Sequence, residues 1–127
     1  MKYSVDKQDR YTVFQLEEEN LNSVVAPDLK SEIVILHNEG VNNLIFDLSK
    51  VKYVDSSGLS AILTADRLWK SNGSFVLTGI EHPSVKKLFE ISRLDSVLSL
   101  VPTKAEAVEY VFMEELQREL EKDEEEE

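Results

Sequence analysis

Hydrophobic and polar residues alternate along the first part of the chain with the period of two that is typical of β-strands. β-Branched and aromatic residues follow this period in two runs, residues 2–5 and 11–16, and the polar stretch 6–10 separates them. These runs predict an antiparallel hairpin. The run at residues 43–48 has too few polar positions for an exposed face, so it predicts a central strand covered on both sides.

Apolar residues three or four positions apart predict about four helices. The first begins at Pro27, because the fixed φ angle of proline suits the first helical turn, and Leu29, Ile33 and Leu36 share one of its faces. Strands are expected between the later helices, at residues 74–79 and 97–101. The later helices are expected to begin at Ser56, Pro83 and Thr103.

Strands separated by helices predict mostly parallel pairing with right-handed crossovers. The fold class is therefore α/β, with a mixed, mostly parallel sheet, an antiparallel N-terminal hairpin at its edge and about four packed helices. The chain has 127 residues, of which 42% are hydrophobic. This length suffices for one domain with a real core and is too short for two.

The predicted last helix carries apolar residues that continue into an acidic C-terminus. We expect Ala105, Val108 and Phe112 to pack on the domain, and Leu116 and Leu120 repeat the spacing of Phe112 among charged residues. Two interpretations stay open for these leucines. They belong to a solvated appendage, or they form a stripe that docks on the sheet or on a second copy of the chain. The chain is accordingly expected to be a monomer or a weak dimer.

The charge of the chain is concentrated at its C-terminus. Of the formal net charge of −11, residues 114–127 contribute nine acidic and two basic residues, or −7. We expect the domain to span residues 1–113 and residues 114–127 to form an acidic helical extension. Its end, residues 123–127, is expected to be disordered.

Composition excludes several classes of function. An acidic chain without a basic stripe is a poor nucleic-acid binder, because affinity for nucleic acid depends largely on phosphate neutralisation by Lys and Arg. The chain has no cysteine, so disulfides and thiolate chemistry are excluded. No signal core or run of about 20 apolar residues is present, and we expect a cytoplasmic protein without direct membrane insertion.

The segment between the predicted central strand and the second helix carries the candidate site, Asp55-Ser56-Ser57-Gly58. Oxygen side chains at a helix start can accept hydrogen bonds from unpaired backbone N–H groups, and the helix dipole favours an anion there, such as a phosphate on serine. Asp55 could cap the helix or orient the hydroxyl of Ser56. Gly58 could admit a partner or a neighbouring strand, or it could reflect only the local loop geometry.

The run from Asp55 to Leu59, after an apolar strand and before Pro83-Ser84-Val85-Lys86-Lys87-Leu88-Phe89, resembles a STAS domain, the fold of bacterial anti-sigma factor antagonists. The resemblance covers about residues 1–113. It implies that Ser56 is the serine phosphorylated by an anti-sigma factor that is itself an ATP-dependent serine kinase. It also implies that Asp55, Ser57 and Gly58 contact this partner, which binds the unphosphorylated chain and is released after phosphorylation.

One segment differs from the usual pattern of this family. Antagonists usually carry Gly-Glu-Leu-Asp on the kinase-binding surface after the second strand, where this chain has Glu19-Asn20-Leu21-Asn22. Asn20 and Asn22 are thus candidate partner-binding residues, although Asn22 cannot form an ion pair. The change favours an alternative function, a constitutive STAS adaptor subunit of a transport or signalling assembly, in which Ser56 only caps the helix. An ordinary polar connection is an equal interpretation of this segment.

No residue is predicted to be catalytic or to bind a metal or cofactor, so the chain is not expected to be an enzyme. His37 and His82 lie far apart in sequence without clustered carboxylates, which excludes a recognisable metal set or Ser-His-Asp triad. A nucleotide- or lipid-binding STAS domain is a third possibility for which no specific residues are present. Trp69 is expected to pack in the core.

Overall fold

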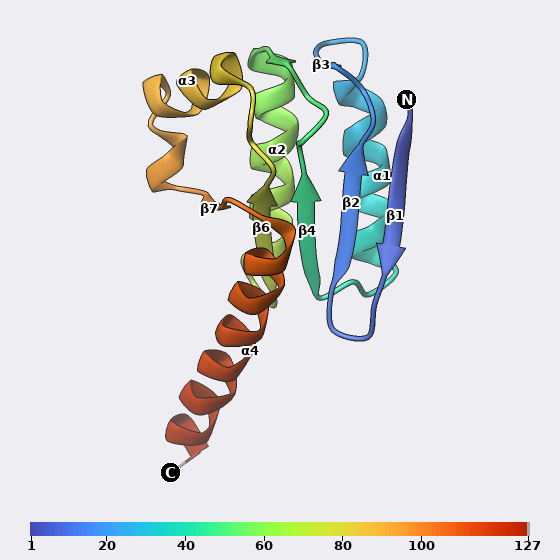
Figure 1. Ribbon diagram of the computed structural model, residues 1–127. Helices are drawn as coiled ribbons and strands as arrows, with labels where there is room; N and C mark the ends of the chain where they lie inside the picture. The colour runs from blue at the N-terminus through green and yellow to red at the C-terminus, as the bar shows by residue number, and fades with distance from the viewer. Residues whose placement is uncertain (127) are drawn as a thin grey trace.

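A five-stranded sheet forms the centre of the computed structural model, which describes residues 1–126 and the side chains of residues 1–124. The strand order is β1-β2-β4-β6-β7 (Figure 1). β1 and β2 form an antiparallel hairpin, and all other neighbours pair in parallel, which confirms the predicted mixed sheet. The strands are β1 (Tyr3–Lys7), β2 (Thr12–Leu16), β4 (Asn43–Asp47), β6 (Ser74–Thr78) and β7 (Ser99–Val101).

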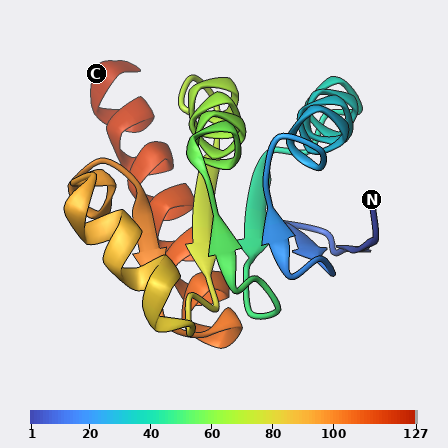
Figure 2. The ribbon, with the colours of Figure 1, turned by 90° about the horizontal axis from the view of Figure 1, so that it is seen from above.

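Helices cover both faces of this sheet. α1 and α2 lie side by side on one face, and α4 begins on the other face and runs past the end of the sheet (Figures 1 and 2). α3 and a short 3₁₀ turn, η1 (Leu94–Ser96), connect β6 to β7. The four predicted helices are confirmed as α1 (Ala26–Asn38), α2 (Ser56–Trp69), α3 (Pro83–Ile91) and α4 (Lys104–Glu126).

The side chains of β4 alternate between two cores. Leu44 and Phe46 are buried in the core beneath α1 and α2, and Ile45 is buried in the smaller core beneath α4. Each of the three side chains has no exposed area. The prediction of a central strand covered on both sides is therefore confirmed.

Trp69 closes the larger core between α2 and the end of α1. Its side chain is buried, and its indole N–H donates to the carbonyl of Val41 at 3.0 Å. The ring of His37, in the last turn of α1, meets the indole edge-on with 5.1 Å between the ring centroids. The prediction that Trp69 packs in the core is confirmed.

The contact face of α4 differs from the prediction. Ala107 and Val111 are buried against the sheet, whereas Ala105 and Phe112 are exposed and Val108 is only partly buried. The predicted packing of Ala105 is therefore wrong. Phe112 does contact the domain, although it stays 41% exposed: its ring meets Tyr11 edge-on with 6.2 Å between the centroids, and Arg10 lies over it at 5.9 Å. α4 carries two apolar stripes, one with the small side chains Ala107 and Val111 and one with Phe112. The direction in which the chain enters α4 from β7 turns the first of these toward the sheet.

The C-terminal part of α4 also differs from the prediction. The helix continues through Glu126, so the break predicted at Asp123 is wrong, and the prediction for Glu127 lies outside the described residues. Adding a residue to an existing helix gains a backbone hydrogen bond without new nucleation, which favours continuation. Leu116 and Leu120 are exposed and do not dock on the sheet. The domain boundary between residues 113 and 114 stays a prediction.

The packing of α4 predicts that Ile45 contributes strongly to stability. Replacing it by Ala should lower the free energy of unfolding by about 2–5 kcal/mol, because a cavity would form between β4 and α4. The control Leu116→Ala, on the exposed side of α4, should change stability by no more than about 0.5 kcal/mol. Urea unfolding of the two variants measures both values. Equal losses would contradict the assigned orientation of α4.

Candidate functional site

A second, two-stranded sheet builds the candidate site at the end of the molecule where α2 begins. Its strands, β3 (Asn20–Leu21) and β5 (Tyr53–Val54), pair in parallel. The backbone carbonyl of Glu19 accepts hydrogen bonds from the N–H groups of Lys52 at 2.7 Å and Tyr53 at 3.1 Å. This pairing brings the connection after β2 against the turn that opens α2. Sequence patterns missed β3, because two residues are too few to show a period.

Asp55 is the N-cap of α2. Its Oδ1 accepts the N–H of Gly58 at 3.0 Å, and its backbone carbonyl accepts the N–H of Leu59 at 3.0 Å. Of the two roles predicted for this residue, capping is thus confirmed. A side-chain cap of this kind stabilises a helix by about 1 kcal/mol.

Ser56 occupies the first helical position and does not cap the helix. Its side chain is exposed, and its hydroxyl has no hydrogen-bond partner among the described residues. The interpretation in which Ser56 only caps α2 is therefore wrong, because Asp55 takes that role. Ser57, its neighbour, is half-buried.

Gly58 permits the closest contact in the site. A Cβ atom at this position would lie 2.5 Å from the carbonyl oxygen of Leu21 and 2.9 Å from Cγ1 of Val54. The same carbonyl of Leu21 accepts the N–H of Asp55 at 3.1 Å. Of the reasons considered for a small residue here, the approach of a neighbouring strand is the one that the structure supports.

Asn22 connects β3 to α1. Its Oδ1 accepts the N–H groups of Val24 at 3.0 Å and Val25 at 3.2 Å, and its backbone carbonyl accepts the N–H of Ala26 at 2.8 Å. Asn22 therefore has a structural role in the turn that leads into α1, whose own N-cap, Val25, makes no side-chain cap hydrogen bond. Asn20 is exposed on β3, opposite Tyr53.

A shallow groove of about 310 Å³ separates the first turns of α1 and α2. The ammonium group of Lys30 donates to the hydroxyl of Ser60 across this groove at 3.3 Å. Neither residue stands out in the sequence as part of the site, although Ser60 follows Ser56 by one helical turn and Lys30 follows Pro27 by three residues. The groove is lined by Ser23, Ala26, Pro27, Lys30, Ser56, Ser57 and Ser60.

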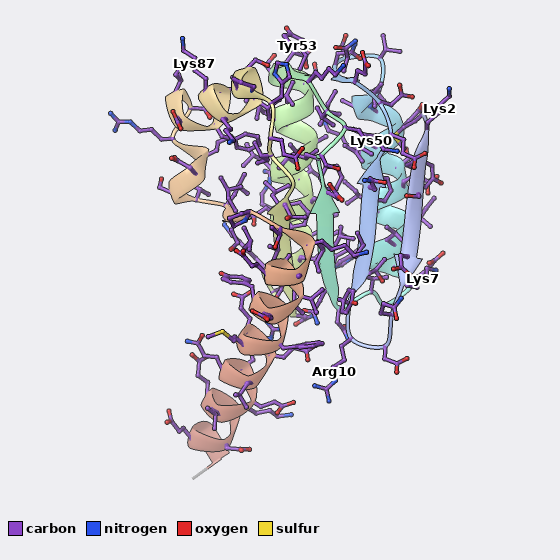
Figure 3. The ribbon with its side chains drawn as sticks, viewed as in Figure 1. Lys2, Lys7, Arg10, Lys50, Tyr53 and Lys87 are labelled. Carbon is purple, nitrogen blue, oxygen red and sulfur yellow. The ribbon has the colours of Figure 1, made fainter. Side chains whose placement is uncertain are left out.

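Two exposed apolar side chains belong to the segments that frame Ser56. Val24 is 79% exposed at the start of α1, and Tyr53 is 53% exposed on β5. Figure 3 shows Tyr53 at the end of the molecule where α2 begins, with Arg10 at the opposite end. Sequence analysis missed these two residues as well. An exposed aromatic ring beside a polar site is typical of protein-binding surfaces.

The site presents an exposed surface and the hydroxyl of Ser56. Among the described side chains, those of residues 1–124, no three His, Asp or Glu are arranged to hold a metal ion. The helices of this same part of the chain include none with the length and apolar character needed to cross a membrane. His82, the other histidine, is the N-cap of α3 and accepts the N–H of Ser84 at 3.3 Å.

Comparisons with known proteins agree on one family. The family model of the STAS domain matches residues 2–107. The chain is 30% identical over 108 residues to a protein of Bordetella bronchiseptica named "Putative anti-sigma factor antagonist BtrV", covering 84% of this chain and 91% of that protein.

Solved structures show the same fold. An anti-sigma factor antagonist from Mycobacterium paratuberculosis superposes with a TM-score of 0.79 at 23% identity, covering 87% of this chain and 92% of that one. A protein from Thermotoga maritima, named "putative anti-sigma factor antagonist", superposes with a TM-score of 0.77 at 25% identity, covering 86% and 93%.

The close contact at Gly58 predicts that replacing this helical glycine by alanine lowers the stability of the protein, which is the opposite of the usual effect. Alanine in a helix normally stabilises relative to glycine by about 1 kcal/mol. Gly58→Ala should instead lower the free energy of unfolding by about 1–3 kcal/mol, because the added methyl group overlaps the carbonyl of Leu21. Thermal and urea unfolding measure this value, with Ser60→Ala as a near-neutral control. A stabilised Gly58→Ala protein would contradict the close approach of β3.

Proposed function

Because the chain belongs to the STAS domain family, we propose that it is an anti-sigma factor antagonist whose partner is an anti-sigma factor with serine kinase activity. The unphosphorylated chain binds this kinase and so frees the sigma factor, and phosphorylation of Ser56 ends the complex. The chain is then a binding module and a kinase substrate in the cytoplasm rather than an enzyme. The 30% identity to BtrV supports the antagonist role.

The observation that carries the phosphorylation step is the free hydroxyl of Ser56. It is exposed at the first position of α2, while Asp55 alone provides the side-chain cap. A kinase can therefore modify this hydroxyl without breaking a hydrogen bond on which α2 depends. Ser57, in contrast, is half-buried beside it.

The free protein should tolerate a phosphate at this position. The N–H groups of Ser56 and Ser57 have no acceptor inside the helix, and the positive end of the helix dipole favours an anion. Lys30 supplies a positive charge on the opposite side of the groove. The phosphorylated chain is thus expected to stay folded.

A bound partner should not tolerate the same phosphate. The modification adds about −1.5 to −2 charges at neutral pH. A partner that packs against Val24, Tyr53 and a neutral hydroxyl would have to exclude water from this charge, and an uncompensated buried charge costs several kcal/mol. Phosphorylation therefore favours dissociation.

The constitutive adaptor is the second candidate function. Its supporting observation is Asn22, which occupies the position of the usual family aspartate and uses its side chain to hold the turn before α1. In an adaptor, the charge state of Ser56 would not change partner binding. The two functions therefore differ in one measurable property.

Substitutions at Ser56 test the phosphorylation switch. Ser56→Asp should weaken binding of the anti-sigma kinase at least tenfold, or about 1.4 kcal/mol, because it adds a charge to the contact surface. Ser56→Ala should bind like the wild type and accept no phosphate. Calorimetry and mass spectrometry measure these outcomes, using the kinase captured from cells that produce the chain.

The control for added charge is Ser96→Asp on η1, which should bind the kinase like the wild type. Unfolding curves should show that Ser56→Asp is as stable as the wild type. Equal kinase affinity of the wild type, Ser56→Asp and the phosphorylated chain would leave the adaptor function instead.

Asn22 tests whether the β3 segment belongs to the partner surface. Asn22→Asp should keep the unfolding free energy within about 0.5 kcal/mol, because a carboxylate oxygen can accept the same two N–H groups. It should nevertheless change affinity for the kinase, since it adds a charge beside the site. Asn22→Ala should lose about 1 kcal/mol of stability. If Asn22→Asp is destabilised and its kinase affinity is unchanged, Asn22 has only a structural role.

A further inference from the structure

The C-terminal part of α4 exposes a continuous apolar stripe far from Ser56. Its three residues, here called the outer stripe, are Met113, Leu116 and Leu120, with exposed fractions of 71%, 57% and 55%, and Phe112 beside them contacts Tyr11 and Arg10 of the domain. Single exposed apolar residues are ordinary, but a contiguous row on one helix is typical of an interaction surface. This part of α4 lies at the end of the molecule opposite the start of α2 (Figure 1).

The outer stripe faces away from the sheet. An α-helix turns by about 100° per residue, so Leu116 lies about 140° and Leu120 about 180° around the axis from the buried Val111. The face that packs on the domain and the outer stripe are therefore nearly opposite. Among the described residues, neither hydrophobic core includes Met113, Leu116 or Leu120.

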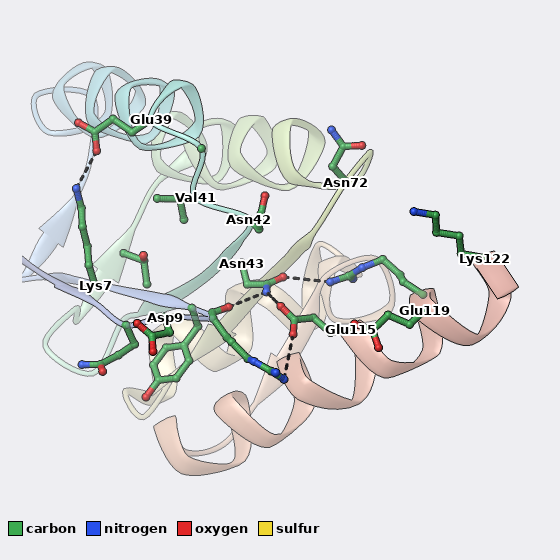
Figure 4. Close-up of a pocket in the computed structure, with 16 residues that line it drawn as sticks. Lys7, Asp9, Glu39, Val41, Asn42, Asn43, Asn72, Glu115, Glu119 and Lys122 are labelled. Atoms are coloured by element: carbon green, nitrogen blue, oxygen red, sulfur yellow. Dashed lines mark hydrogen bonds and ion pairs between the residues drawn. The ribbon is translucent and has the colours of Figure 1, made fainter.

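Polar contacts hold the inner side of α4 in place beyond the small core. The guanidinium group of Arg118 donates to Oδ1 of Asn43 at 3.2 Å and to the hydroxyl of Ser74 at 3.0 Å. Nδ2 of the buried Asn43 donates to the carboxylate of Glu115 and, at 2.8 Å, to the carbonyl of Arg10 (Figure 4). These contacts fix the direction in which the outer stripe is presented.

The charges of α4 are divided between its two sides. Arg118 and Lys122, the basic residues of its second half, lie on the side of Val111 and line a polar pocket of about 630 Å³ between α4 and the β1–β2 turn. By the same helical geometry, Glu109, Asp123 and Glu124 lie beside the outer stripe. The exposed apolar row is thus bordered by acidic residues.

The end of α4 carries an unfavourable charge arrangement. Its last turn has no basic residue, although the negative end of the helix dipole favours cations. A basic group bound there would reduce both the dipole interaction and the repulsion among the acidic side chains. The helix end is therefore complementary in charge to a cationic partner.

We propose that the outer stripe is a docking site for a basic amphipathic helix of a partner protein. Leucine-like side chains of that helix would cover Met113, Leu116 and Leu120, and its Lys or Arg residues would pair with Asp123 and Glu124. This site is additional to the Ser56 surface and does not depend on the proposed antagonist function.

The acidic residues beside the outer stripe also argue against two other occupants, a second copy of the chain and a lipid surface. In a pair of identical α4 helices, the acidic borders of both copies would face each other, and Arg118 is already bound to Asn43 and Ser74 on the inner side. Bacterial and other anionic lipid surfaces attract basic helices and repel acidic ones. A basic protein helix is the occupant that satisfies both the apolar row and its acidic borders.

A pair of synthetic peptides tests this proposal on the full chain. One is a helical leucine–lysine peptide with leucines at i, i+3, i+4 and i+7, and the other carries glutamate in place of lysine. At physiological salt, the lysine peptide should bind and the glutamate peptide should bind at least tenfold more weakly. Fluorescence anisotropy measures the affinities, and hydrogen exchange should show protection of residues 112–124 by the lysine peptide.

Variants separate the outer stripe from general charge attraction. Leu116→Gln with Leu120→Gln, and separately Asp123→Asn with Glu124→Gln, should each weaken lysine-peptide binding at least tenfold. The matched controls Ile91→Gln with Val97→Gln, and Glu81→Gln with Glu90→Gln, should bind like the wild type. Ser56→Asp should also bind like the wild type, which makes the test independent of the phosphorylation switch.

Two results would overturn the proposal. One is equal lysine-peptide affinity of the wild type and the Leu116→Gln, Leu120→Gln variant. The other is a wild-type dimer in sedimentation analysis that this variant loses, because the occupant would then be a second copy of the chain.

Discussion

The candidate site depends on one close contact, between the carbonyl of Leu21 and the first turn of α2. This oxygen accepts the N–H of Asp55 and leaves no room for a side chain at Gly58. Because Leu21 is followed directly by Asn22, whose side chain holds the turn before α1, the contact also links the start of α2 to the segment that leads into α1. The groove beside Ser56 lies between the first turns of these two helices. A backbone oxygen and a missing methyl group thus position three segments that are distant in sequence.

In this turn, the residue that caps α2, Asp55, is distinct from the residue proposed to be phosphorylated, Ser56. Asp55 satisfies the unpaired N–H of Gly58, so the hydroxyl of Ser56 contributes little to helix stability. The helix start still attracts anions through its remaining N–H groups and its dipole. Such a site can gain a charge without losing its fold, which is the physical requirement for a reversible modification that acts on binding rather than on stability.

Much of this architecture was predictable from the sequence, because the hydrophobic period of a long segment indicates which of its faces is buried. The central strand at β4, the hairpin and the four helices follow from that periodicity, and the turn at Asp55 follows from capping chemistry. β3 was not predictable, since its pairing partner lies more than 30 residues away and two residues show no period. The orientation of α4 was not predictable either, because both Ala107 with Val111 and Phe112 with Leu116 form plausible contact faces.

If Ser56 is phosphorylated as proposed, the discontinuous construction of its site determines what the kinase can recognise. Ser56 lies in a helix, and its surroundings come from β3, the start of α1 and β5, so a short extended peptide with the same local sequence would lack most of the surface. The kinase would therefore recognise the folded surface around Ser56 rather than a short linear sequence. Under the proposed function, a chain in which β3 has separated from β5 would not present the complete surface and would not be modified, so only folded copies would take part in the switch.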